Sequence, residues 1–247
     1  MGSRAGSKST TRFAIAARQH YVGVVLAGLF LAATLAAAPL TIEVADHQVW
    51  VRGVTPGASV ALFGAGYGQG IVSPFLFDWA GLGQDDNQDG AVQIIPPTGH
   101  GYDTTVSHSV WVAVDLTSGV WGKTVLSLAS GWTAWTEVPL TQSDLVREPL
   151  GVIAVCPSWA GTTRESRWAT ALVRAGRGMW TGASIVGDAP AALVFTEMTP
   201  VRDAGAPPQR LAPGDVLVAI NPQSHGYYAD AISLELLTAG RLRVQLR

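Results

Sequence analysis

SHSVWVAVDL, residues Ser107–Leu116, is the stretch that decides the fold class, because it shows the pattern of a β-strand most clearly. The stretch Gly122–Leu128 follows it, and we expect the two to pair as a hairpin. Other short stretches rich in Val, Thr and aromatic residues recur at roughly ten-residue spacing, with turn-forming residues between them. Such spacing is typical of sandwiches and barrels. We therefore predict an all-β protein with one or two antiparallel β-sandwich modules.

The composition also favours strands and turns. The 247 residues include 28 Gly and 14 Pro, and only 14% are charged. Gly and Pro favour the turns, while Val, Thr and aromatic residues favour the strands. The length allows one large core or two small ones. Cys156 is the single cysteine and cannot form an internal disulfide, so we expect packing or bound ions to stabilise the fold.

Two further hairpins are expected from the local pattern. Gln48–Val54 and Ser59–Gly64 flank the turn sequence Thr55-Pro56-Gly57. Ser166–Arg174 and Met179–Val186 flank an Ala-Gly turn. In each case a short turn between two strand-like stretches predicts antiparallel pairing.

The segment Gly64–Gly70 is rich in glycine and contains a G-x-G-x-G pattern. A phosphate-binding loop of this kind lies between a strand and a helix. Because Ile71–Pro74 is a poor helix start, we interpret the segment as a flexible connection between strands.

The N-terminal part has the features of an export signal. Tyr21–Leu40 is an apolar run without a charged residue, and four basic but no acidic residues precede it. The run approaches the roughly 20 residues that a membrane-spanning helix needs. We therefore predict that residues 1–38 are a cleaved signal peptide or an N-terminal membrane anchor. In both cases the remainder is secreted or extracytoplasmic, in the periplasm or on the cell surface.

A change in charge near Gly131 suggests a domain boundary. Residues 39–135 carry 2 basic and 8 acidic residues, whereas 136–247 carry 10 of each. We predict an acidic β-sandwich module at 39–130 and a second β-rich module at 131–247. Thr55–Leu62 resembles Ala212–Ala219, and the tripeptide His-Gly-Tyr occurs at both 100 and 225. Matches this short are typical of unrelated turns that precede strands, so we do not take them as a repeat.

The charge balance limits the class of partner. Without residues 1–38 the chain keeps 12 basic and 18 acidic residues, a net charge of −6. Nucleic acids and anionic lipids need Lys and Arg gathered on one face. We therefore predict no nucleic-acid partner, and membrane contact only through an uncleaved N-terminal segment.

Nine tryptophans are many for a chain of 25.8 kDa. Trp50 and Trp111 lie in strand-like stretches, and we expect both in the core. Trp132 and Trp135 lie instead among small polar residues near the expected boundary. An exposed pair there could stack on a sugar ring or on a partner protein, so we predict Trp132 and Trp135 as ligand-binding residues.

The acidic loop Asp85–Gly90 fits the first half of a calcium-binding loop, D-x-[DN]-x-[DN]-G. The side chains of Asp85, Asn87 and Asp89, with the backbone carbonyl of Ala91, would converge on one cation. The Glu expected at position 12 is replaced by Pro96, so Asp78 or Asp103 would have to supply the missing carboxylate. The alternative is a solvated acidic turn without an ion.

Catalytic motifs are sparse. Ser, His and Asp sets can be assembled, but the chain contains neither G-x-S-x-G nor H-E-x-x-H. The two sets are Ser107, His108, His100 and Asp103, and Ser224, His225 and Asp230. We therefore predict an exported, non-catalytic binding or adhesive protein that is carbohydrate-binding and braced by calcium. The alternatives are a structural or assembly protein of the cell envelope and, third, a secreted hydrolase.

Overall fold

The computed structural model describes residues 38–45, 48–69, 74–96, 108–127, 132–137, 145–148, 151–155, 167–186, 192–208 and 211–234. All of them belong to one compact unit, residues 37–247. The elements of this part are β-strands, so the predicted all-β class is confirmed. The predicted export segment lies outside the described residues, apart from its last few positions. Within the described ranges, no helix has the length and hydrophobicity needed to cross a bilayer.

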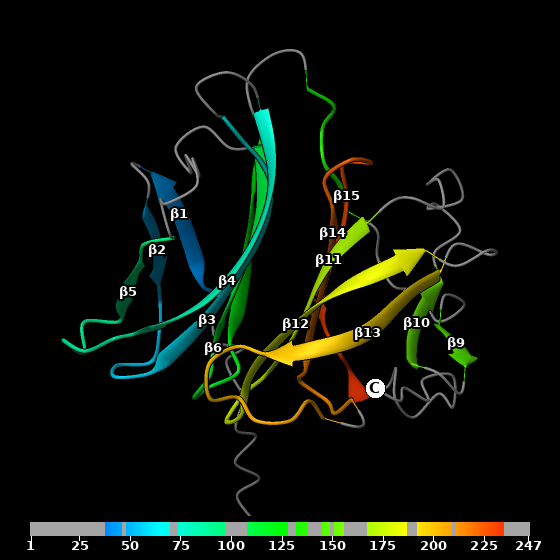
Figure 1. The fold of residues 1–247 in the computed structure, drawn as a ribbon. Helices are drawn as coiled ribbons and strands as arrows, with labels where there is room; N and C mark the ends of the chain where they lie inside the picture. Colours follow the sequence, from blue (N-terminus) through cyan, green and yellow to red (C-terminus); the bar gives the residue numbers. More distant parts are fainter. Residues whose placement is uncertain are drawn as a thin grey trace, which may run out of the picture. The chain divides into compact units, whose positions relative to one another are not determined.

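A four-stranded antiparallel sheet stands at the centre of this unit (Figure 1). Its strands are, in sheet order, β4 (Pro74–Gln84), β3 (Ser59–Gln69), β6 (His108–Asp115) and β7 (Trp121–Leu126). The predicted hairpin at Ser107–Leu116 is confirmed as β6 and β7, with Val112 opposite Lys123. The Gly-rich stretch was expected to be a connection, and this is wrong, because most of it forms the second half of β3.

Gly64 does not form a turn; it makes room within the sheet for the side chain of Trp111. A Cβ atom on Gly64 would lie 2.2 Å from Cε3 of Trp111, which occupies the opposite position on β6. Real side chains do not approach so closely. The sequence pattern therefore reports a close approach within the sheet.

A second, three-stranded sheet contains β1 (Thr41–Ala45), β2 (Gln48–Arg52) and β5 (Ala91–Ile94), in that order. The expected hairpin between Gln48–Val54 and Ser59–Gly64 is therefore wrong, since β2 and β3 belong to different sheets. The turn between them carries the chain from one sheet to the other.

Two buried carboxylates hold that crossing. The backbone N–H of Thr55 donates to Asp115 Oδ2 at 2.7 Å, and that of Gly57 donates to Asp85 Oδ2 at 3.1 Å. Both carboxylates are almost fully buried. A buried carboxylate that accepts several amide hydrogen bonds fixes a turn far more rigidly than sequence propensity does.

The third sheet has eight strands in the order β8-β15-β14-β11-β12-β13-β10-β9. All of its pairings are antiparallel except β8 with β15, where Thr136 and Glu137 pair parallel with Gly226 and Tyr227. The predicted hairpin around the Ala-Gly turn is confirmed as β11 and β12. The bounds, in chain order, are β8 Thr136–Glu137, β9 Leu145–Glu148, β10 Gly151–Val155, β11 Arg167–Arg174, β12 Gly178–Val186, β13 Ala192–Pro200, β14 Val216–Asn221 and β15 Gly226–Ala231.

The central sheet is buried on both faces, and this explains the sequence of β6. Val110, Val112 and Val114 pack into a core shared with β11, β14 and β15. Trp111 and Ala113 point the other way, into a core shared with β1, β2 and β5. A strand covered on both sides has no polar face, so every residue of β6 is buried. The arrangement is a sandwich with a third, smaller layer.

The two resembling stretches begin with the same local structure. Ala58 N–H donates to the carbonyl of Thr55 at 2.9 Å, and Asp215 N–H donates to that of Ala212 at 3.1 Å. Each turn has Pro in its second position and a Gly with φ near +80° in its third, at Gly57 and Gly214, as in a type II turn. The likeness is one of turn chemistry before a central strand.

The core between the central and the large sheet contains residues from both predicted modules. Phe63 and Val112 come from segment 39–130, and Val218 and Ala229 come from 131–247. The boundary near residue 131 stays a prediction, and both segments contribute to one shared core.

Charged side chains lie at both edges of the central sheet. Asp78 on β4 lies opposite the buried Ala65, and Lys123 on β7 lies opposite the buried Val112, so both share the face that meets the large sheet. Inward-pointing charges on edge strands discourage pairing with another chain. Segment 38–40 also covers part of β7, where Leu40 N–H donates to the carbonyl of Trp121 at 3.3 Å.

Candidate functional site

Aromatic and imidazole side chains from four separate stretches converge at one end of the shared core. Tyr67 and His108 lie opposite each other on β3 and β6. His225 comes from the turn between β14 and β15. Trp132 and Trp135 come from the segment just before β8. We call these five residues, together with Tyr227 of β15, the aromatic cluster.

His108 lies at the centre of this cluster. Its ring centroid is 5.0 Å from that of Trp135, nearly parallel to it, and 5.3 Å from that of Trp132. The His225 ring stands edge-on to it at 5.0 Å. Tyr67 contacts Trp132 at 4.9 Å between centroids. Rings at these separations attract one another and hold a defined geometry.

Three of the four ring nitrogens of the two imidazoles are buried without a partner within the described ranges. His108 is completely buried, and neither Nδ1 nor Nε2 makes a hydrogen bond. Nε2 of His225 and Nε1 of Trp135 are likewise buried without a partner among the described residues. Unpaired buried polar atoms destabilise a fold and are frequent at functional sites.

The surroundings favour neutral imidazoles. Burial lowers the pKa of His108 below its ordinary value, and the nearby His225 lowers it further, while the backbone of Thr133 offsets part of this. Burial also lowers the pKa of His225. Near pH 7 the cluster therefore holds two uncharged imidazoles, each with a hydrogen-bond donor and an acceptor.

The turn that carries His225 is held in an unusual backbone conformation. His225 has a φ of 52°, in the left-handed region that only a small share of non-glycine residues adopt. Asn221 is fully buried, and its Oδ1 accepts hydrogen bonds from the backbone N–H groups of Gln223 and Ser224 at 2.9 and 3.2 Å. The turn thus presents the imidazole to the cluster from a rigid support.

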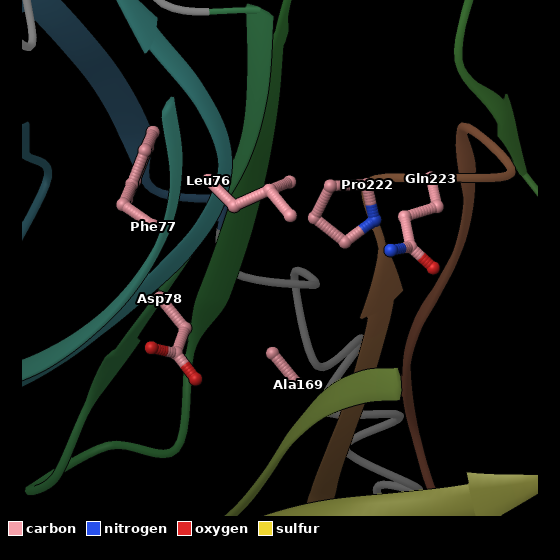
Figure 2. A pocket seen from close by; sticks show the side chains of 6 residues that line it. All are labelled: Leu76, Phe77, Asp78, Ala169, Pro222 and Gln223. Carbon is pink, nitrogen blue, oxygen red and sulfur yellow. The ribbon is translucent and has the colours of Figure 1, made fainter. Parts of the chain in front are cut away.

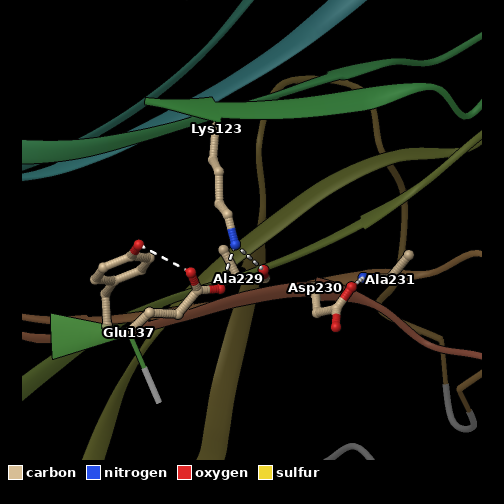
Figure 3. Close-up of polar contacts among 6 residues, drawn as sticks. Lys123, Glu137, Ala229, Asp230 and Ala231 are labelled. Carbon is tan, nitrogen blue, oxygen red and sulfur yellow. Dashed lines mark hydrogen bonds and ion pairs between the residues drawn. The ribbon is translucent and has the colours of Figure 1, made fainter. Parts of the chain in front are cut away.

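A polar group adjoins the cluster and holds the segment that contains the two tryptophans (Figure 3). The Tyr227 hydroxyl donates to Glu137 Oε2 at 3.1 Å, and Lys123 Nζ forms an ion pair with Glu137 Oε1. The Lys123 ammonium also lies 5.8 Å from the centre of the Tyr227 ring. Burial and Glu137 raise the pKa of Tyr227 to about 12, so its hydroxyl stays protonated.

A pocket of about 220 Å³ opens beside the turn of His225 (Figure 2). Leu76 and Asp78 of β4 line one side of it, and Pro222 and Gln223 of the turn line the other. Leu76 is half exposed and lies opposite Tyr67. Ala169, a small residue of β11, leaves the space open.

Trp132 and Trp135, predicted as ligand-binding residues, therefore lie together in the structure. Both are half-buried, and they pack against His108 and His225 rather than forming an isolated exposed pair. Of the two tryptophans expected in the core, Trp111 is fully buried. Trp50 is half-buried, so its placement in the core is wrong, and the guanidinium of Arg52 lies 5.5 Å from its ring.

The acidic loop is built around Asp85. Its Oδ2 accepts the N–H groups of Gly57 and Gly90, at 3.1 and 3.0 Å, and its Oδ1 accepts that of Asp89 at 3.2 Å. Oδ1 and Oδ2 of Asp89 accept from the Ala91 N–H and from Asn87 Nδ2. Every carboxylate oxygen of the two aspartates is thus already hydrogen-bonded.

The remaining parts of the predicted calcium site are not gathered there. Asp78 lines the pocket of Figure 2 with residues of the large sheet, and Asp103 lies outside the described residues. Within the described ranges, no group of three or more His, Cys, Asp or Glu side chains is placed to hold a metal ion. Calcium at Asp85, Asn87, Asp89 and Ala91 stays a prediction.

Neither proposed catalytic set is assembled in the described part of the chain. His100, Asp103 and Ser107 lie outside it. Asp230 is exposed on β15, and its Oδ1 accepts the N–H of Ala231 (Figure 3). No hydrogen bond among the described residues joins His225 to Ser224 or to Asp230.

In the sequence, His108 and His225 stand out only as members of two alternative hydrolase sets. Nothing local brings the two residues together, because they are more than a hundred positions apart. The signal that could have found them is the His-Gly-Tyr turn at 225, where a histidine in a tight turn is followed by a strand residue that faces the same core.

Comparison with known proteins finds no matching family model, no similar curated protein and no similar solved structure.

Proposed function

We propose that this chain is an exported binding protein, and that the aromatic cluster is its site for a carbohydrate ligand. The proposal rests on how the Trp132 ring is packed against its neighbours. Its half-buried ring is packed against Tyr67 and His108, next to the half-buried His225. A tryptophan fixed in this way, with part of its surface still open, is a preformed stacking surface.

A sugar fits the chemistry of this surface. The apolar face of a pyranose ring stacks on an aromatic ring, and its hydroxyl groups need both donors and acceptors. The exposed side-chain amide of Gln223, which lines the adjoining pocket, supplies both. A site of apolar rings with a few convergent polar atoms is the usual composition of a small-molecule site. The pocket beside Leu76, with the Gln223 amide at its rim, would accommodate a neighbouring sugar unit.

Titration of intrinsic tryptophan fluorescence with a broad panel of soluble polysaccharides tests the proposal. At least one glycan should quench or shift the emission of the full chain. The response should be lost in Trp132→Ala and kept in the control Trp50→Ala, whose half-buried ring lies in another sheet. No response across the panel, or an unchanged response in Trp132→Ala, would refute the assignment.

The competing proposal is a structural or assembly role in the cell envelope. Leu76 and Ile95 are large apolar side chains that are 50% and 61% exposed, and either could meet a partner. Size-exclusion chromatography separates the two proposals. A monomer that captures no envelope protein and responds to a glycan supports the binding role, and the reverse result supports assembly.

The third proposal, hydrolysis, has a separate test. A serine-reactive probe that labels Ser107 or Ser224 would support it, and a chain that remains unlabelled would count against it.

Export rests on the N-terminal sequence. Cleavage would leave a mature N-terminus between Ala36 and Pro39, and Edman or mass-spectrometric sequencing of the protein recovered from cells decides this. A full-length chain that is extracted only by detergent would indicate an anchor.

A further inference from the structure

We infer that the aromatic cluster is a pH-sensitive latch: mild acid releases the segment Trp132–Glu137 from the sandwich through the paired imidazoles of His108 and His225. The inference concerns the attachment of this segment and does not depend on any ligand. We call residues 132–137 the strap.

Protonation of His108 within the closed cluster costs free energy. An imidazolium carries two N–H donors, and both need acceptors. The His108 nitrogens are buried without a hydrogen bond in the described part of the chain, and the rings of Trp132, Trp135 and His225 surround them. The backbone of Thr133 favours the charged ring, but burial and His225 outweigh it. Stacking of a cation on Trp135 recovers part of the cost. The second imidazole at 5.0 Å opposes a second charge.

Among the described residues, no unpaired negative charge faces the cluster to offset a protonated imidazole. Tyr67 and Tyr227 face the cluster from β3 and β15, and burial raises the pKa of both, so they stay neutral. Glu137 faces it from the strap, but Lys123 of β7 already forms an ion pair with it. Asp78 shares the face of His108 but lies on β4, with β3 between them.

The sign of the effect follows from the direction of the two shifts. The pKa values of His108 and His225 are below the ordinary 6.5 in the folded chain. Above pH 6.5 both the folded and the opened forms are neutral, and the cluster keeps its full stability. As the pH falls below 6.5, the opened form binds protons first, so the closed form loses stability until the lower folded pKa values are reached.

The strap is the part of the cluster that we expect to move. His108 lies within β6, and His225 joins two strands of the large sheet. The strap is attached by a two-residue parallel pairing, by the Thr136 N–H donating to the His225 carbonyl at 2.8 Å, and by the side-chain contacts of Glu137. Local opening takes place where fewest backbone hydrogen bonds must break. Release of the strap would bring both imidazoles into water.

Hydrogen–deuterium exchange of the full chain, followed by mass spectrometry at pH 7.5 and 5.5 and corrected for intrinsic exchange rates, tests the inference. Protection of peptides covering the strap should fall at the lower pH, by up to about tenfold for each imidazole, because pH 5.5 lies one unit below the ordinary value of 6.5. Peptides covering β11 should keep their protection. Equal loss in β11 and in the strap would indicate general unfolding and overturn the inference.

Matched variants test whether His108 and His225 are the groups whose protonation releases the strap. The double variant His108→Phe, His225→Asn keeps a ring at the first position and a residue that tolerates positive φ at the second. It should retain strap protection at pH 5.5, unlike the natural chain. If the double variant fails to fold, the single variant His225→Asn should still reduce the loss of protection. A pH response that is equal in the natural chain and in His225→Asn contradicts the inference.

Discussion

Replacement of Gly64 by Ala tests the packing of the central sheet, because Gly64 faces the fully buried ring of Trp111. In an extended strand without special contacts, Gly→Ala stabilises a protein by about 0.4–1 kcal/mol, since it restricts the unfolded chain. In this structure the added Cβ would lie 2.2 Å from Cε3 of Trp111, and 2.5 Å from both Cδ2 and Cζ3. The expected sign is therefore reversed.

The magnitude follows from how firmly Trp111 is held. Its Nε1 donates to Ser109 Oγ at 2.9 Å, and the rings of Phe77 and Trp79 lie at 5.8 and 6.3 Å. The ring cannot move without disturbing the core that contains the three-stranded sheet. Overpacking typically costs about 1–3 kcal/mol, and we expect Gly64→Ala to lose about 2–3 kcal/mol of unfolding free energy.

Urea unfolding followed by far-UV circular dichroism measures this loss. Gly226→Ala is the matched control, because its Cβ would meet no atom closer than 3.3 Å, and we expect a change within about 0.5 kcal/mol. The double variant Gly64→Ala, Trp111→Leu should be less destabilised than the sum of its single variants, since the smaller side chain makes room. A Gly64→Ala chain as stable as the natural one would refute the three-layer packing.

Further predictions concern three buried carboxylates. Asp215 is 1% exposed and forms a bidentate ion pair with Arg174. Asp215→Ala should therefore lower the free energy of unfolding in urea by about 3–5 kcal/mol. The control Glu43→Ala, which breaks an exposed ion pair, should lower it by about 0.5 kcal/mol or less. Asp85→Ala removes the acceptor of three backbone N–H groups and should cost about 2–4 kcal/mol. If Asp85 also binds calcium, excess calcium should raise the Tm of the natural chain above its value in EDTA, and identical melting curves would exclude this. Burial opposes ionisation of Asp115, but hydrogen bonds from Thr55, Ser118 and Thr117 outweigh it and lower its pKa. Its stabilising contribution is therefore complete above pH 3.8 and is lost as the pH falls through the lower folded value, and a stability–pH profile of Asp115→Asn should lack this slope.

The strands of the central hairpin could be predicted because their pattern is local. Ser107–Leu116 alternates between two apolar sets, and a tight turn joins it to its partner. The third layer could not be predicted in this way. Trp111 and Ala113 pack against the three-stranded sheet. Their apolar character does not reveal this, because residues on that face would be apolar in a two-layer fold as well, so the pattern does not predict the number of layers.

The partner of a strand is decided by contacts far away in sequence. Thr55-Pro56-Gly57 has the sequence of a hairpin turn, yet Asp115 and Asp85, more than 25 residues away, bind its amides and direct β3 into another sheet. The acidic loop shows the same limit. Its spacing fits a cation, whereas burial of Asp85 directs its oxygens to backbone amides, and burial cannot be read from spacing.

The candidate site was only partly visible for a similar reason. Trp132 and Trp135 stand out as tryptophans among small polar residues, and this identified the segment. Their partners His108 and His225 come from different sheets, and only the packing of those sheets brings the imidazoles within 5.0 Å of each other.

The most direct test of the central claim is ¹⁹F NMR of the full chain labelled with 5-fluorotryptophan, with resonances assigned by single Trp→Phe variants. A bound glycan should shift the resonance of Trp132 and leave that of Trp50 unchanged. Without ligand, the resonances of Trp132 and Trp135 should titrate together below pH 6.5. A glycan response confined to other tryptophans would contradict the binding site, and Trp132 and Trp135 resonances that stay constant from pH 7.5 to 5.5 would contradict the latch.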